Sequence, residues 1–172
     1  MNIQDWRALL PDHFSPDSRA WVYQSDRQLN DNESKQVGEQ LYRFYTQWIS
    51  HNRPVKGWAG VLFNRFIVFI ADDTMDRLCG SAVDNSIRLV KDLEAQYGLK
   101  LLDRTLLAFV IDDHIESLSL RRIPEALETG KIDRETLYFN NTITTRSALD
   151  EDWLIKVKDS WLVRKFLSQT TA

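Results

Sequence analysis

Cysteine is almost absent from this chain of 172 residues, in which Cys79 stands alone. One cysteine excludes an intrachain disulfide and every motif built from paired cysteines. Proteins without disulfides are typical of reducing compartments. The first eighteen residues include Asp5, Asp12 and Asp17 and no apolar run, so we expect no secretory signal. The sequence therefore predicts a cytoplasmic protein.

Long apolar runs and an excess of charge of one sign are also lacking. The longest apolar stretch, 58–71, is interrupted by Asn64 and Arg65 and is too short and too polar to cross a bilayer. The formal net charge is −3, without the basic balance that nucleic-acid binding requires. We therefore expect neither a membrane nor a nucleic acid among the partners.

The familiar catalytic and cofactor motifs are missing as well. The chain holds no G-x-x-x-x-G-K-[ST] phosphate loop, no G-x-G-x-x-G, no H-E-x-x-H and no G-x-S-x-G. No motif therefore requires a cofactor, although a divalent metal stays open. Hydrophobic residues make up 43% of the chain and charged residues 27%, which predicts one globular domain over 1–172.

Hydrophobic periodicity predicts the elements of a core over 19–111. Strands are expected at 20–23, 58–63, 66–71 and 105–111. Asn30 and Glu33 form a capping box for a helix that should end near His51 and Asn52, before Pro54. A second helix starts at Ser81, which forms a capping box with Asp84, and ends at Gly98.

This β-α-β-β-α-β order predicts an α+β fold of the ferredoxin-like, split β-α-β type. Its antiparallel sheet has the strand order 4-1-3-2, with two helices on one face. An α/β extension over 112–172 should pack on this core, with a helix at 123–129, an edge strand at 138–145 and a helix at 153–167. An open sheet edge makes a homodimer compatible with the sequence.

In that topology one end of the sheet gathers histidine and acidic residues. The start of the second helix lies at the same end, within the segment 79–86 that follows Asp72 and Asp73 directly. The candidate ligand-binding residues are His51, Asp72, Asp73, Gly80, Ser81, Asp84 and Ser86, with Lys56 beside them.

Three interpretations of this end compete. A divalent metal could bind His51, Asp72, Asp73 and His114, because carboxylates and imidazoles are natural metal ligands. A small anion could bind at the N-terminus of the second helix. The structural interpretation makes Ser81 and Asp84 helix caps and places His51 at the C-terminus of the first helix. Cys79 lies near a helix start, where a thiol pKa can be lowered, but a single cysteine is a weak signal for catalysis.

Several short motifs occur in a fixed order along the chain. They are W-V-Y-Q-S-D-R at 21–27, W-I-S-H at 48–51, A-D-D at 71–73, G-S-A-V-D-N-S at 80–86, L-L-D-R at 101–104, F-N-N at 139–141 and D-S-W at 159–161. As an ordered set they resemble a family of small bacterial proteins that carry the label "ABC transporter ATPase", and the resemblance covers nearly the whole chain. The label implies ATP hydrolysis, yet the phosphate loop and the signature motif of such ATPases are absent here.

Two positions depart from the family pattern. Asp73 stands where the family usually has glutamate, and Ser81 stands where it usually has cysteine. If the family used that cysteine as a nucleophile, this chain would lack it. The positions that match are Trp48, His51, Asp72, Gly80, Asp84 and Ser86.

Three functions follow from these observations. The first is a small-ligand-binding or protein-interaction module without catalysis, because no catalytic signature is present. The alternative is a metal-assisted hydrolase that uses His51, Asp72 and Asp73 as ligands or acid–base groups. The third is nucleotide hydrolysis as the family label implies, which the missing phosphate loop disfavours.

Overall fold

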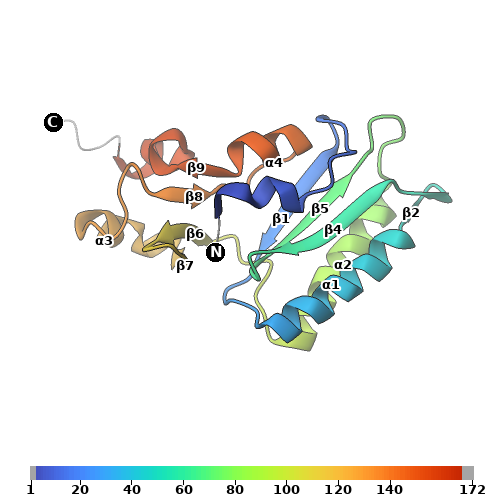
Figure 1. Cartoon of the computed structure of the whole chain (residues 1–172), viewed down its shortest axis with the longest axis horizontal. Helices are drawn as coiled ribbons and strands as arrows, with labels where there is room; N and C mark the ends of the chain where they lie inside the picture. Colours follow the sequence, from blue (N-terminus) through green and yellow to red (C-terminus); the bar gives the residue numbers. More distant parts are fainter. Residues whose placement is uncertain (1–2, 168–172) are drawn as a thin grey trace.

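A three-stranded antiparallel sheet forms one half of the molecule (Figure 1). The computed structural model describes residues 3–167, so 1, 2 and 168–172 of the predicted domain lie outside it. The sheet order is β1-β5-β4, and β5 is the central strand. These strands are β1 (Arg19–Gln24), β4 (Gly57–Leu62) and β5 (Phe66–Ala71).

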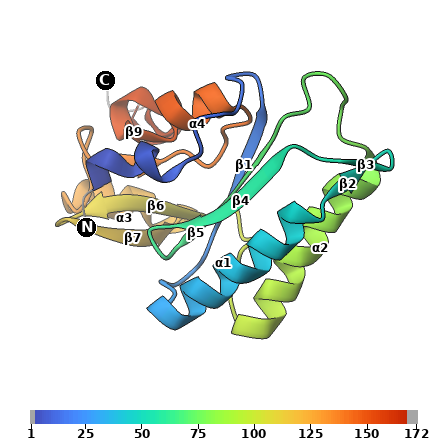
Figure 2. The same cartoon turned by 45° about the vertical axis from the view of Figure 1, so that its right-hand side comes forward.

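Two long helices lie side by side on one face of this sheet (Figure 2). They are α1 (Asp31–Thr46) and α2 (Gly80–Tyr97), and the hairpin of β2 (Ile49–Ser50) and β3 (Arg53–Pro54) follows α1. All six residues of β5 are buried, as its continuous apolar run predicts for a strand covered on both faces.

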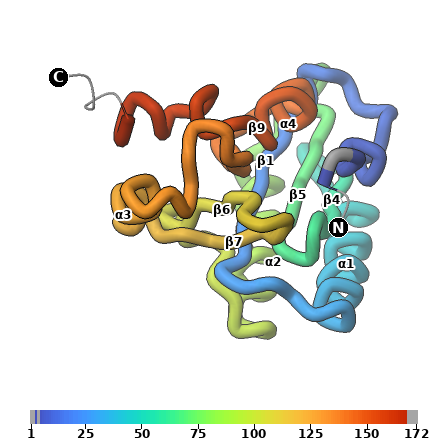
Figure 3. The backbone as a smooth tube through the Cα atoms, turned by 60° about the vertical axis from the view of Figure 1, so that its left-hand side comes forward, coloured from blue at the N-terminus to red at the C-terminus, as the bar shows by residue number. Residues whose placement is uncertain are grey.

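A second antiparallel sheet has the order β7-β6-β8-β9. Figure 3 shows β6 and β7 running side by side, and the two strands pair as one antiparallel hairpin. Its strands are β6 (Leu106–Ile111), β7 (His114–Ser119), β8 (Leu137–Phe139) and β9 (Leu154–Lys156). Short helices complete this half: η2 (Leu120–Arg122), α3 (Ile123–Glu128), α4 (Arg146–Asp152), η3 (Val157–Asp159) and η4 (Val163–Leu167).

The α+β class is confirmed, but the fourth strand of the expected sheet lies elsewhere. β6 pairs with β7 on one edge and with β8 on the other, so it has no edge left for β1. Asp112 and Asp113 adopt φ values of 49° and 60°, which matches the two-residue turn that closes a tight hairpin. The chain therefore folds straight back as β7, and β6 belongs to the C-terminal sheet.

Local signals were correct where they concern one element alone. The capping box of Asn30 and Glu33 is formed in both directions, and Gly98 ends α2 with a left-handed φ of 61°. The first helix, however, ends at Thr46, and His51 and Asn52 form the left-handed turn between β2 and β3. His51 is therefore not a partner for the dipole of α1.

Three further expectations were wrong. The N-cap of α2 is Cys79, without a side-chain hydrogen bond, so the predicted capping box of Ser81 and Asp84 is not formed. The predicted helix at 153–167 is instead the strand β9 followed by the short helices η3 and η4. Trp153 and Val157 have helical spacing, but they lie in different hydrophobic clusters, so the spacing does not reflect one helical face. The predicted edge strand 138–145 is a short strand between β6 and β9.

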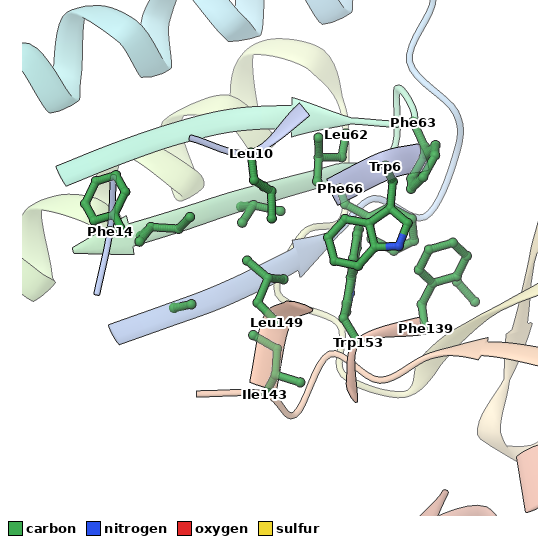
Figure 4. Close-up of a cluster of buried hydrophobic side chains, with 14 residues drawn as sticks. Trp6, Leu10, Phe14, Leu62, Phe63, Phe66, Phe139, Ile143, Leu149 and Trp153 are labelled. Carbon is green, nitrogen blue, oxygen red and sulfur yellow. The ribbon is translucent and has the colours of Figure 1, made fainter. Parts of the chain in front are cut away.

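One buried cluster joins the two sheets (Figure 4). The ring centroids of Trp6 and Trp153 lie 4.7 Å apart, and both indoles are 1% exposed or less. Phe66 of the first sheet and Phe139 of the second each lie 5.1 Å from Trp153. Trp6 belongs to the 3-10 helix η1 (Ile3–Leu9) and packs in a cluster that contains residues of both sheets. The N-terminal segment is thus part of the core.

Candidate functional site

The outer edge of β1 is one of the two edges of the first sheet, and only part of its backbone is paired. In an antiparallel strand, alternate residues turn their N–H and C=O groups to opposite neighbours. The Ser25 N–H donates to the Arg65 carbonyl, so odd-numbered residues face β5. The Ala20 N–H donates to the Thr144 carbonyl, so even-numbered residues face outward. The backbone groups of Val22 and Gln24 therefore point away from the sheet.

Two segments pair with this edge, but only at its ends. Thr144 bonds the start of β1 at 3.0 Å, and the Lys100 carbonyl accepts the Asp26 N–H at 3.2 Å just after its end. The segment that contains Thr144 does not continue along β1, because its earlier residues, from Asn141 back, lead to β8 of the second sheet. Among the described residues no backbone partner is found for the N–H groups of Val22 and Gln24. The middle of β1 thus remains unpaired on this side.

A cleft of about 460 Å³ lies along this unpaired edge. All six residues of β1 line it, which makes the strand edge its floor. The start of α2 and the 101–107 segment form part of the wall, and Tyr138 of β8, the loop 141–144 and Trp161 form the rest. The apolar and aromatic wall residues are Val83, Ile87, Leu101, Leu102, Leu106, Leu107, Tyr138, Ile143 and Trp161.

Positive charge borders this cleft at two points. Arg19 and Arg104 both line it, and both are exposed. No ion pair within 4 Å is found for either guanidinium in the described part of the chain. Arg19 lies over the Trp21 ring at 5.4 Å from its centroid. The cleft therefore combines an aromatic surface with two cations that are available to a ligand.

Tyr23 adds a hydroxyl to the same surface. Burial raises the pKa of Tyr23 above its ordinary value, although a hydrogen bond from Trp21 and the charges of Arg104 and Arg19 act to lower it. The phenol is therefore neutral at physiological pH and can donate a hydrogen bond. The one carboxylate that lines the cleft, Asp103, accepts hydrogen bonds from the N–H and hydroxyl of Thr105 at 2.9 and 2.6 Å.

A chain of side-chain hydrogen bonds fixes the inner end of the cleft. Nδ2 of Asn141 donates to Oε1 of Gln24 at 2.9 Å, and the Trp153 indole donates to Oδ1 of Asn141 at 2.9 Å. The amide of Gln24 and the guanidinium of Arg65 both donate to the hydroxyl of Ser117, at 3.2 and 2.7 Å. This network spans both sheets and holds the walls of the cleft in one arrangement.

The predicted site residues do not form this cleft. Asp72 does lie beside Lys56, as the sequence predicts, with Oδ2 at 2.9 Å from Nζ. Hydrogen bonds from Thr74 and Lys56 lower the pKa of Asp72 below its ordinary value. Asp73 borders a separate, open hollow together with Arg19 and Arg77. Asp72 thus forms an ion pair with Lys56 and accepts hydrogen bonds from Thr74 in the turn that follows β5.

His51 lies in a turn of the first half, whereas His114 is the first residue of β7 in the second sheet. His51 is exposed in the β2–β3 turn, and Nδ1 of His114 lies 2.6 Å from the Asp112 carbonyl in the β6–β7 hairpin. Across 3–167, no group of three or more His, Cys, Asp or Glu side chains is placed to hold a metal ion. The metal site therefore stays a prediction without a supporting cluster.

The start of α2 surrounds the Cys79 thiol with hydrogen-bonding groups. Sγ lies 3.1 Å from Oγ of Ser81, and the Cys79 N–H donates to Oγ of Ser50 at 2.9 Å. Hydrogen bonds from Ser50, Ser81 and the N–H groups of His51 and Ala82 lower the pKa of this thiol to about 6. The residues at the start of the predicted segment 79–86 thus form hydrogen bonds that favour the thiolate of Cys79.

The other predicted residues of that segment have structural positions. Gly80 begins α2, Asp84 is exposed on its first turns, and Ser86 is buried with its hydroxyl donating to the Val83 carbonyl at 2.7 Å. Sequence reasoning missed the cleft because its floor and walls come from distant segments. The only local signal is the alternation of Arg19, Trp21 and Tyr23 along one strand.

None of the helices in the described residues is long and apolar enough to span a membrane.

Comparison of the chain with protein-family models, with curated proteins and with solved structures gives no match in any of the three. The resemblance found in the ordered motifs therefore stays a prediction, and geometry has to support the function.

Proposed function

We propose that this chain is a binding module without catalysis, and that it holds an anionic ligand in the cleft beside β1. The observation that carries this proposal is the pair of guanidinium groups, Arg19 and Arg104, at an aromatic-lined cleft, where no ion pair is found for either among the residues that the structure describes. Arginine binds carboxylate and phosphate groups in a planar, two-pronged geometry. Such contacts strengthen where the ligand leaves water.

The chemistry of the lining supports binding over turnover. No histidine, cysteine or lysine is among the residues that line the cleft, so three common catalytic side chains are missing there. The titratable side chains other than arginine are Tyr23, Asp103 and Tyr138. Asp103 is engaged by Thr105, and Tyr138 accepts a hydrogen bond from the Trp161 indole at 3.2 Å.

The arrangement of the first sheet also supports this proposal, because it matches part of a ferredoxin-like fold. β1, α1, β4, β5 and α2 keep the order of a split β-α-β fold, and their sheet has the order β1-β5-β4. In the full fold the fourth strand would pair with the outer edge of β1. We infer that the cleft occupies the place of that strand. The cytoplasmic location predicted from the single cysteine is part of this proposal.

A thermal melt with small organic anions tests the proposed function. Benzoate, succinate and inorganic phosphate are each added to the protein alone and to the Arg104→Gln variant. A ligand at 100 times its dissociation constant adds roughly 2.7 kcal/mol of stability, which raises the melting temperature measurably. We expect a shift that Arg104→Gln removes and that the control Arg121→Gln, an exposed arginine of η2, retains. A shift that persists in Arg104→Gln would contradict this site.

A further inference from the structure

We infer that the natural ligand of this cleft is an extended acidic peptide segment of a partner protein, which joins the first sheet as an added strand along the outer edge of β1. This inference rests on the proposed function, because it uses the same cleft and the same two arginines. It adds the backbone of β1 as the main recognition element.

The unpaired backbone groups are the first argument. The Ala20 and Asp26 N–H groups are already bonded, at 3.0 Å to Thr144 and at 3.2 Å to Lys100. Between them, Val22 and Gln24 present outward donors that have no backbone partner among the described residues. A strand edge of this kind is a template for a further strand, and addition of a peptide strand is an established mode of recognition. A compact anion would leave these donors unused.

The length of the gap limits the size of the peptide. A strand rises about 3.3 Å per residue, so the open stretch between the two bonded ends admits about four paired residues. A neighbouring strand lies about 4.8 Å away, and the space it needs is the cleft itself. Longer peptides would have to leave the edge at Thr144 or at Lys100, where the chain's own segments are bonded.

The walls and charges indicate the peptide's sequence type. Successive side chains of an added strand point to opposite faces. One face would meet Val83 and Ile87 of α2, and the other would meet Ile143 and Trp161. Arg19 begins β1, and Arg104 follows the segment that bonds its other end. An apolar peptide with acidic residues complements both features.

The sheet provides a matched pair of proline variants for the test. Proline removes a backbone donor and is tolerated only where that donor faces away from the sheet. Val22→Pro removes an outward donor of β1 and leaves its bonds to β5 intact. The Asp72 N–H donates to the Lys56 carbonyl, so odd-numbered residues of β4 face the opposite edge of the sheet. Val61→Pro therefore removes an outward donor of β4 as the control.

Fluorescence anisotropy measures binding of a fluorescein-labelled hexapeptide with four central valines, which match the two apolar walls, and a glutamate at each end, which matches the two arginines. We expect the wild type and Val61→Pro to bind this peptide, and we expect Val22→Pro to lose at least tenfold in affinity. The same peptide with an N-methylated backbone should bind the wild type at least tenfold more weakly. This second comparison keeps the test valid if Val22→Pro does not fold. A lysine–valine hexapeptide should also bind at least tenfold more weakly, because it repels both arginines.

The outcomes separate the two proposals. If benzoate, succinate or phosphate shifts the melt through Arg104 but the acidic peptide does not bind, the peptide inference is overturned and the proposed function stands. Equal binding to Val22→Pro and to the wild type would overturn the inference in the same way, because the β1 edge would not take part. If neither the anions nor the peptide bind, both proposals fail.

Discussion

Asn141 and Gln24 connect the two sheets directly, with Nδ2 of Asn141 donating to Oε1 of Gln24 at 2.9 Å. The other amide atom of Asn141, Oδ1, accepts a hydrogen bond from the buried Trp153 indole. Both amides also line the cleft. One asparagine therefore links the core between the sheets to the wall of the proposed site.

Asn141→Ala should lower the free energy of unfolding by about 1–3 kcal/mol. The substitution leaves the Trp153 indole N–H and Oε1 of Gln24 without partners, and unpaired buried polar groups carry a cost of that size. Chemical unfolding followed by tryptophan fluorescence measures the change. Asn85→Ala, an exposed position on α2, is the control and should stay within about 0.5 kcal/mol. Equal losses in both variants would contradict the role of Asn141.

Two glycine-to-alanine substitutions should have opposite signs. Gly98 has a φ of 61° and open space around its Cα, so an added methyl group brings backbone strain alone. Gly98→Ala should therefore destabilise the protein by about 1 kcal/mol. Gly38 lies within α1, also in open space, and Gly38→Ala should stabilise by about 0.5–1 kcal/mol. Thermal and urea unfolding of the two variants provide the comparison, and a gain in stability from Gly98→Ala would contradict the left-handed C′ assignment.

The Cys79 thiol should titrate with a midpoint near pH 6, because hydrogen bonds from Ser50 and Ser81 favour the thiolate. The thiolate absorbance at 240 nm, followed against pH, measures this midpoint. Ser50→Ala should move the midpoint upward, toward that of a free cysteine, because it removes the largest contribution. Ser34→Ala, on α1, serves as the control. A wild-type midpoint near pH 8.5, the value of an unperturbed thiol, would show that these contacts do not stabilise the thiolate.

Acid should weaken the start of α1. The Arg27 guanidinium and the Asn30 N–H bond the Glu33 carboxylate and lower its pKa to about 2. Because the folded pKa lies below the unfolded one, this contribution is complete above about pH 4.5 and is lost as the pH falls through about 2. The difference in unfolding free energy between wild type and Glu33→Gln should therefore shrink between pH 6 and pH 3.

Urea unfolding at both pH values tests this expectation, with Glu39→Gln on the same helix as the control. A difference that stays constant down to pH 3 would contradict the charge-assisted cap.

Asn30→Ala, which removes the other half of the capping box, should lower the stability by about 1 kcal/mol at neutral pH.

The sequence allowed most of the first half of the fold to be predicted, because its signals are local. Asn30 and Glu33 mark the start of α1, Gly98 marks the end of α2, and the apolar run 66–71 predicts a central strand. The sheet to which β6 belongs depends instead on strands that are distant in sequence, because β1, β7 and β8 could each pair with one of its edges. Asp112 and Asp113 form a tight turn without the glycine that usually signals one, so the hairpin was missed.

The candidate site was harder to predict than the fold. Asp72 and Lys56 were expected together and do meet, since both flank the same strand pair. His114 was placed with them only because β6 was assigned to the first sheet. The cleft itself depends on where Thr144 and Lys100 stop pairing with β1, and no local pattern of residues encodes that point.

The contact between Trp6 and Trp153 also has a consequence for the order of events during synthesis. A ribosome adds about 5–20 residues per second, so Trp6 emerges on the order of ten seconds before its partner exists. During that interval the indole lacks the part of its native site that the second half of the chain supplies, Phe139 and Trp153 among it. The nascent chain therefore carries an exposed aromatic segment until the second sheet is made, and chaperone capture of ribosome-bound chains should be strongest before Trp153 emerges.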